Sequence, residues 1–379
     1  MINICCYIGD SYGCGFYRIV QPYGYLADLK RCNIRVRNVM SDIDMEWSDI
    51  IVLQRQNNEN VYNKVSPYKG RKLLVYEIDD YFHDIPSSNF CSQNYKDKDK
   101  IRMIEKFMEL CDVVTVSTDS LKEKYSEFNK NIYVCSNCAD MRYVNKDIKT
   151  KDDSVVRIGW AGSPTHHGDL RLVSDVVGKT LKDFENKIKF VIIGFDYRGY
   201  FKKYLKDYQM EYIGWSSIIE SDQNEEYRYK NPVFDYYNNL YNANLDIGIA
   251  PLVDNIFNRC KSNIKAIEYG SIGIPCIASN VKPYRDFIDN NLWYKREDSC
   301  GLLCSDNTEW KKSLIELINN NDLRKSMSIK SKEKVVNKYS LEVRIIDWLK
   351  MIEENFKVSK LRKLENNEEM IKVVIGVNK

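Results

Sequence analysis

Short apolar runs alternate with amphipathic stretches along most of the chain. Amphipathic stretches, such as residues 17–29 and 101–110, lie between several of the runs. Runs this short are typical of strands buried in a parallel sheet that helices cover on both faces. The pattern therefore predicts a doubly wound α/β domain for the first half of the chain. Its apolar runs cover residues 2–8, 34–39, 50–53, 73–78, 113–116 and 132–134.

The alternation is interrupted once and then resumes. Residues 139–154 are polar, rich in Lys and Asp, and without a clear period, so they are expected to form a linker. The second half then repeats the strand and helix alternation and predicts a second doubly wound domain of similar size. Its apolar runs cover residues 155–160, 190–193, 212–213, 245–252, 276–278 and 301–303.

Two further segments have patterns of their own. Residues 216–231 are strongly polar and are expected to form a surface loop. Residues 340–356 carry apolar side chains at helical spacing, Trp348 among them, so the helix that they predict needs a surface to pack on. The last stretch, residues 359–379, is charged and then apolar, and no structure is assigned to it.

Size, charge and cysteine content limit the possible classes of protein. A chain of 379 residues exceeds what one core usually supports, and 57 basic against 54 acidic residues exclude a strongly basic nucleic-acid-coating protein. The apolar N-terminus stops at Gly9 and no run reaches 18 apolar residues, so we expect no transmembrane segment and a cytoplasmic location, in a bacterium or a phage-infected host. The twelve cysteines are expected to be reduced and mostly packed in the core. Four of them offer thiolates for zinc, but their irregular spacing favours packing and no metal site: Cys135, Cys138, Cys300 and Cys304.

The strongest chemical pattern lies between two apolar runs of the second half. The run at 245–252 predicts a strand, residues 255–261 a loop, and Ser262 and Asn263 the cap of a helix. Lys261, Lys265 and Glu268 fall at i, i+4 and i+7, which places them on one face of that helix near its positive end. Free N–H groups, the helix dipole and two lysines suit a diphosphate, and a carboxylate one turn deeper suits ribose hydroxyls. A solvated stripe of charges is the plainer alternative, but ligands bind beyond the carboxyl ends of parallel strands.

This region resembles the donor-binding core of GT-B glycosyltransferases of family four (the group 1 type), in particular short members from phages and bacterial polysaccharide clusters. The resemblance covers about residues 1–350. It implies two Rossmann-like domains facing a cleft: an acceptor domain at 1–145, a donor domain at 155–338, and a helix at 339–358 that packs back on the first domain. It rests on Lys261-Ser262-Asn263, Lys265, Glu268 and Gly273-Ile274-Pro275, with support from Tyr17-Arg18, Tyr76-Glu77-Ile78-Asp79-Asp80 and Gly159-Trp160-Ala161-Gly162-Ser163-Pro164.

The chain departs from the family pattern at two places. Eight positions before Glu268, where relatives carry a glutamate that contacts the transferred sugar, this chain has Cys260. Other groups must then recognise the sugar, and Asn258 and Arg259 are candidates. The usual Arg and Lys after the strand that enters the second domain are also missing, and the matching loop offers the candidate donor contacts Ser163, His166 and His167.

Other candidate site residues follow strands of both halves. Gly13 and Gly15 allow close approach of the backbone to donor phosphate or sugar, and Arg18 would add positive charge. Asp79, Asp80 and His83 are candidates for binding the acceptor hydroxyl or acting as a base. The plainer alternative for the glycine segment is an ordinary tight turn. For the acidic segment it is a loop with capping carboxylates and a surface histidine. Trp215 is a candidate for stacking on the nucleobase, with core packing at least as suitable for a single Trp.

The sequence therefore predicts a glycosyltransferase that moves a sugar from a nucleotide-sugar donor, most simply a UDP-sugar, to a hydroxyl of a glycan, a protein or modified DNA. By the family resemblance, the anomeric configuration is retained and no metal or other cofactor is needed. Two alternatives stay open. One is a phage-type transferase acting on hydroxymethylated or hypermodified pyrimidines in DNA, and the other is a degenerate transferase that binds nucleotide sugars without turnover.

Overall fold

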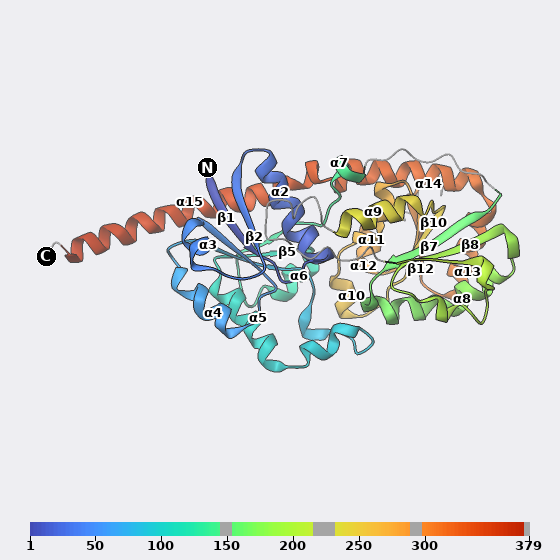
Figure 1. Cartoon of the computed structure of the whole chain (residues 1–379), viewed down its shortest axis with the longest axis horizontal. Helices are drawn as coiled ribbons and strands as arrows, with labels where there is room; N and C mark the ends of the chain where they lie inside the picture. Colours follow the sequence, from blue (N-terminus) through green and yellow to red (C-terminus); the bar gives the residue numbers. More distant parts are fainter. Residues whose placement is uncertain (145–153, 215–231, 289–297, 375–379) are drawn as a thin grey trace. The chain divides into compact units, whose positions relative to one another are not determined.

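The computed structural model describes residues 1–144, 154–214, 232–288 and 298–374, which contain two parallel six-stranded sheets (Figure 1). The predicted fold class, two Rossmann-like α/β sheets, is confirmed. The chain forms two compact units. The first consists of Met1–Asp80, Asp97–Ser136 and Arg344–Lys379, and the second of Tyr81–Lys96 and Asn137–Val343.

The sheet of the first unit has the strand order β2-β1-β3-β4-β5-β6, with every pair parallel. The chain leaves β1 toward one edge and then returns to its other side, so the order reverses between β1 and β3. The strands are β1 (Ile2–Tyr7), β2 (Cys32–Arg37), β3 (Ile50–Gln54), β4 (Leu73–Ile78), β5 (Val113–Val116) and β6 (Ile132–Val134). The helices are α1 (Gly13–Gly15), η1 (Phe16–Val20), α2 (Gln21–Asp28), α3 (Asp42–Trp47), α4 (Glu59–Val65), α5 (Lys98–Leu110) and α6 (Asp119–Tyr125).

The sheet of the second unit has the order β12-β11-β10-β7-β8-β9 and reverses between β7 and β10. Its strands are β7 (Val156–Gly162), β8 (Ile188–Gly194), β9 (Met210–Gly214), β10 (Ile247–Ala250), β11 (Cys276–Ser279) and β12 (Gly301–Cys304). Its helices are α7 (Met141–Val144), α8 (His167–Lys182), α9 (Pro232–Asn242), α10 (Ile256–Cys260), α11 (Ile264–Ser271), α12 (Lys282–Phe287), α13 (Asn307–Asn319) and α14 (Asn321–Lys334). Most of the predicted linker at 139–154 and all of the predicted polar loop at 216–231 lie outside the described residues. The described start of the linker is not irregular throughout, because it contains α7.

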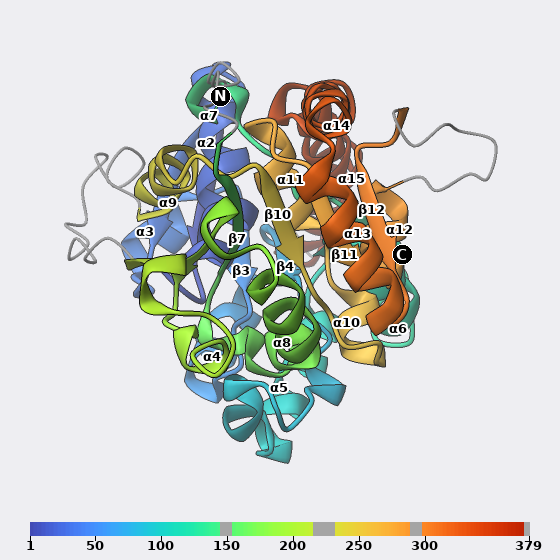
Figure 2. The ribbon, with the colours of Figure 1, turned by 90° about the vertical axis from the view of Figure 1, so that its right-hand side faces the viewer.

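The strand β10 lies inside the second sheet, between β11 and β7 (Figure 2). Its alternate residues face different helical layers. Ile247 and Ile249 belong to the core formed with α8 and α13. Gly248 lies between them and points the other way, as the two-residue period of a strand requires. A Cβ at Gly248 would lie 2.6 Å from the ring of Tyr269 on α11, so the missing side chain lets this helix approach the sheet. The close approach positions the polar residues of α11 at the carboxyl end of β10.

The last helix, α15 (Leu341–Val374), belongs to the first unit from Arg344 onward. Trp348 is fully buried, and Asn355 and Glu354 accept hydrogen bonds from Asn131 and Tyr133 at 2.7 and 2.6 Å. The sequence predicted this helix only to residue 358. It continues because residues 359–374 are rich in Lys, Glu and Leu, which are good helix formers.

Candidate functional site

The polar residues of the second unit converge where the order of its sheet reverses. Loops from the carboxyl ends of β7 and β10 meet at this point, which is where open α/β sheets bind ligands. The sequence predicted one loop at 255–261 followed by a helix. The structure instead has the short helix α10 there, capped by the side chain of Asn255, and α11 begins only after Asn263. Lys261 therefore precedes α11 rather than sharing a helical face with Lys265 and Glu268.

Lys265 is a buried cation, with 7% of its surface exposed. Its Nζ donates a hydrogen bond to the backbone oxygen of Ala161 and lies 5.7 Å from the ring centroid of Trp160. Both partners come from β7, and a Cβ at Gly162 would lie 3.3 Å from the same Nζ. Burial lowers the pKa of Lys265, and the charge of Glu268 opposes that shift. The ammonium is thus held at the end of β7 with little water around it.

Glu268 lies one turn farther along α11 and is equally buried. Its Oε2 accepts a hydrogen bond of 2.8 Å from the hydroxyl of Tyr236, a residue of α9. Sequence reasoning missed Tyr236, because nothing local to α9 distinguishes this tyrosine from a core residue. A carboxylate has two oxygens that accept hydrogen bonds, a chemistry that suits hydroxyl groups.

The segment before α11 forms hydrogen bonds with residues that are distant in sequence. Ser262 Oγ accepts a hydrogen bond of 2.8 Å from Asn137 Nδ2, which leaves the hydroxyl hydrogen of Ser262 to donate elsewhere. Asn263 makes no side-chain cap to α11 and donates instead to the hydroxyl of Tyr339 at 3.2 Å. Lys261 lies with its Nζ 4.4 Å from the ring centroid of Phe257.

A second polar network joins the two loops at the same point. His166 Nδ1 lies 2.9 Å from Asp169 Oδ2, and the other oxygen of Asp169 accepts from Val253 N and Asn258 Nδ2 at 2.9 Å each. Asn258 and Asp169 are buried. Sequence reasoning named His166 and Asn258 but missed Asp169, although its spacing of three residues from His166 was visible. Burial lowers the pKa of His166, the hydrogen bond to Asp169 opposes the shift, and Lys265 lowers it further.

The remaining predicted donor contacts of the second unit are half-buried or exposed, or lie outside the described residues. Ser163 Oγ is 2.7 Å from Thr165 Oγ1, and exposed His167 is hydrogen-bonded by the hydroxyl of Tyr200. Arg259 is half exposed and forms an ion pair of 2.6 Å with Asp254. Trp215 falls outside the described residues.

In the first unit, the two predicted glycines differ in what surrounds them. A Cβ at Gly15 would lie 2.0 Å from the backbone oxygen of Asp10, whereas one at Gly13 would have nothing within 4 Å. Asp10 Oδ1 accepts from the N–H groups of Tyr12 and Gly15 at 2.9 and 3.3 Å, which closes the turn after β1. Gly15 is therefore required by the turn itself.

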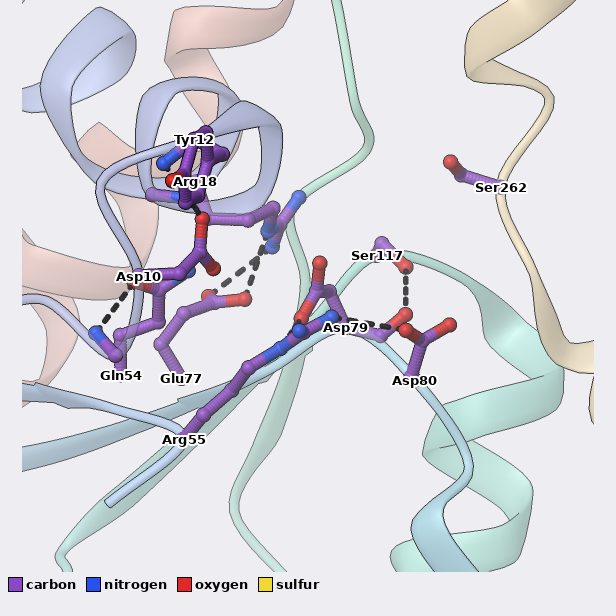
Figure 3. A network of polar contacts seen from close by, with 12 residues as sticks. Asp10, Tyr12, Arg18, Gln54, Arg55, Glu77, Asp79, Asp80, Ser117 and Ser262 are labelled. Carbon is purple, nitrogen blue, oxygen red and sulfur yellow. Dashed lines mark hydrogen bonds and ion pairs between the residues drawn. The ribbon is translucent and has the colours of Figure 1, made fainter. Parts of the chain in front are cut away.

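Arg18, which the sequence placed at the donor, is a fully buried residue of the first unit. Its side chain points toward Glu77 (Figure 3). Its guanidinium binds both carboxylate oxygens of Glu77, at 2.7 and 3.1 Å, and donates to the backbone oxygen of Cys135. Thr115 adds a hydrogen bond to the same carboxylate, and the ring of Trp348 lies 5.5 Å from the guanidinium carbon. Desolvating a cation requires such partners, so Arg18 links β4, β5, β6 and α15 instead of facing a ligand.

Asp79 and Asp80 follow β4 and share one arginine (Figure 3). Arg55, held in the left-handed region with a φ of 52°, binds Asp79 at 2.5 Å and Asp80 at 2.9 Å. Sequence reasoning missed Arg55. His83 belongs to a short helical turn, Phe82–Asp84, that clusters with the second unit, and its ring stacks on Tyr81 at 5.4 Å between centroids. The four predicted catalytic residues are thus divided between the two units, with Asp79 and Asp80 in the first and His83 and Lys261 in the second.

Solved structures with the same architecture identify the fold of this chain. Sucrose-phosphate synthase from Thermosynechococcus elongatus matches with a TM-score of 0.62 at 11% identity, over 94% of this chain and 100% of that one. The fold is that of the GT-B glycosyltransferases. The Anabaena protein HepE, in complex with UDP-glucose, matches with a TM-score of 0.59 at 10% identity, over 93% of this chain and 100% of that one. A putative UDP-N-acetylglucosamine 2-epimerase from Listeria monocytogenes also matches, with a TM-score of 0.54 at 11% identity over 94% and 97% of the two chains.

Searches by sequence give no comparable match. No family description and no curated protein matches this chain. Within the described ranges, no group of three or more His, Cys, Asp or Glu side chains is arranged to hold a metal ion. No helix among the described residues is both long and apolar enough to cross a membrane.

Proposed function

We propose that this protein is a nucleotide-sugar-dependent glycosyltransferase related to GT-B family four. Its second unit would bind the donor, with Lys265 and Lys261 on the diphosphate and Glu268 on the ribose hydroxyls. The observation that carries the proposal is the buried position of both Lys265 and Glu268 on α11, at the reversal point of the second sheet.

Burying two opposite charges destabilises a fold unless they are paired or serve a ligand. Lys265 donates to a backbone oxygen and lies near an aromatic ring, and the carboxylate of Glu268 accepts from a tyrosine hydroxyl. Apolar residues of similar volume would pack at both positions at lower cost. A ligand with an anionic group and neighbouring hydroxyls, such as a nucleoside diphosphate, accounts for both charges together.

The same groups would supply the main catalytic effect. When the glycosidic bond to the donor breaks, negative charge develops on the departing diphosphate. The amino end of α11, Lys261, Lys265 and the hydroxyl of Ser262 would stabilise that charge, which is the part that a metal ion plays in other enzymes. Because these groups are already oriented by Ala161 and Asn137, little reorganisation is needed during the reaction.

The finer parts of the proposal concern the donor and the outcome. A UDP-sugar is the first donor to test, because HepE of the same fold was solved with UDP-glucose. The family resemblance favours retention of configuration and independence from metal. Asp79, Asp80 and His83 are proposed for the acceptor hydroxyl, which would come from a glycan, a protein or modified DNA.

A thermal-shift panel of UDP-, GDP-, ADP- and dTDP-sugars tests donor binding, because a ligand at 100 times its Kd stabilises the folded state by about 2.7 kcal/mol. The Lys265→Met variant should lose that shift and should lower donor hydrolysis and transfer by more than about tenfold. Lys282→Met is the matched control, since Lys282 forms an exposed ion pair with Asp286. Equal binding and turnover in wild type and Lys265→Met would refute the proposal. Tight binding without hydrolysis or transfer to any acceptor would instead favour a binding protein.

A further inference from the structure

The hydrogen bonds of Asp169 fix which nitrogen of His166 carries a proton. Asp169 Oδ1 is occupied by two donors, Val253 N and Asn258 Nδ2, and Oδ2 faces His166 Nδ1 at 2.9 Å. A carboxylate only accepts hydrogen bonds, so the proton in the last contact belongs to Nδ1. The neutral ring then has its lone pair on Nε2.

Nothing in the described part of the chain hydrogen-bonds Nε2 of His166, and the side chain is 19% exposed. Its surroundings also disfavour the doubly protonated ring. Burial and the charges of Lys265 and Lys261 lower the pKa of His166, against the opposing effect of Asp169. A neutral hydrogen-bond acceptor is therefore held beside the two lysines of the donor site.

An acceptor at this place does not suit a phosphate, whose oxygens are themselves acceptors. It suits a group that donates a hydrogen bond and is attached to the phosphates. In a nucleotide sugar, the hydroxyls of the ribose and of the sugar are such donors. The ribose hydroxyls are already proposed for Glu268, which leaves the hydroxyls of the sugar.

We infer that His166 Nε2 accepts a hydrogen bond from a hydroxyl of the donor sugar, and that Asp169 is the positioning residue that holds the ring in the accepting tautomer. The inference rests on the proposed function and adds to it the group that recognises the sugar rather than the nucleotide.

Asp169→Asn tests the inference while keeping the shape of the site. The new amide must keep its oxygen toward the two donors, Val253 N and Asn258 Nδ2, and so points its nitrogen at Nδ1 of His166. Nδ1 then accepts, the proton moves to Nε2, and the ring can no longer accept from a sugar hydroxyl. Asp175→Asn on the same helix is the matched control, because Asp175 lies at the surface and pairs with Lys203.

Calorimetric Kd values for UDP and UDP-glucose, or for GDP and GDP-mannose if the panel selects guanine, give the readout. Asp169→Asn and His166→Ala should weaken the nucleotide sugar about three- to tenfold, which is the value of one neutral hydrogen bond, and leave the nucleoside diphosphate unchanged. A deoxy analogue of the nucleotide sugar that lacks the contacted hydroxyl should bind wild type with an affinity reduced by the same factor. Its affinity should fall no further in Asp169→Asn or His166→Ala. Lowering the pH through the pKa of His166 should weaken binding of the nucleotide sugar relative to the nucleoside diphosphate. This effect should occur in wild type only.

The outcomes distinguish a failure of the proposed function from a failure of the proposed role of His166. If wild type binds none of the nucleotides, the proposed function fails and the inference with it. If wild type binds both ligands and the variants weaken both equally or neither, the donor site stands and this role of His166 is wrong. His166→Ala keeps the test decisive if Asp169→Asn fails to fold.

Discussion

Arg18 and Glu77 form a bidentate ion pair from which water is excluded, with 0% and 1% of their side chains exposed. The pair connects the helical segment after β1 with the end of β4, and the ring of Trp348 from α15 lies against the guanidinium. Charge in this position stabilises the arrangement of three segments distant in sequence. Its loss should therefore affect folding before it affects the chemistry.

Arg18→Met should destabilise the protein by about 3–5 kcal/mol, because it leaves the carboxylate of Glu77 buried without its cation. The double variant Arg18→Met, Glu77→Leu should recover much of that loss, since an apolar pair needs no desolvation. Arg198→Ala, which breaks an exposed pair with Asp196, should change stability little. Urea unfolding midpoints measure all three, and an Arg18→Met protein as stable as wild type would contradict the structural role.

Gly15→Ala should destabilise the first unit by about 1–3 kcal/mol, because the new methyl group would overlap the backbone oxygen of Asp10. Gly13→Ala provides the comparison, since a Cβ there meets nothing within 4 Å and should be tolerated. Thermal unfolding of both variants tests the difference. Equal losses of stability would show that the turn after β1 can relax.

Donor binding should be coupled to protonation of Lys265. Burial lowers the pKa of the free ammonium, and a bound diphosphate would raise it again. Binding should therefore take up a proton at alkaline pH, and affinity should fall as pH rises through the lowered pKa. Calorimetry in two buffers of different ionisation enthalpy measures this uptake, and any residual binding at high donor concentration by Lys265→Met should lack it. Identical heats in the two buffers for wild type would contradict the prediction.

The same shift affects stability without ligand. Because the folded-state pKa of Lys265 lies below its unfolded value, the unfolded chain binds more protons between the two values, and stability should rise with pH in that alkaline window. Unfolding midpoints of wild type and Lys265→Met, compared across this window, isolate the contribution of the one group.

Trp348→Ala should cost about 3–5 kcal/mol, because it removes a fully buried indole between α15 and Arg18. Ile346→Ala on the same helix is the control, since Ile346 is 60% exposed. Chemical denaturation distinguishes the two. A mild loss for Trp348→Ala would mean that α15 contributes little to the first unit.

The sequence alone was sufficient for the fold class. Short apolar runs that alternate with amphipathic segments leave few arrangements other than parallel sheets covered by helices, and both six-stranded sheets follow that pattern. Motif spacing also indicated the region around Lys265 and Glu268 as a candidate site, because ligands of such sheets bind beyond the carboxyl ends of the strands.

Only the tertiary structure decided which charged side chains are buried and by what they are held. Arg18 and Glu77 are 59 residues apart, and His166 and Asn258 meet through Asp169 across two loops separated by more than 80 residues. Pairings of this kind depend on which strands become neighbours, and local periodicity carries no information about that choice. A single sequence therefore indicated the chemistry available to the protein, while the strand order of each sheet determined which groups meet.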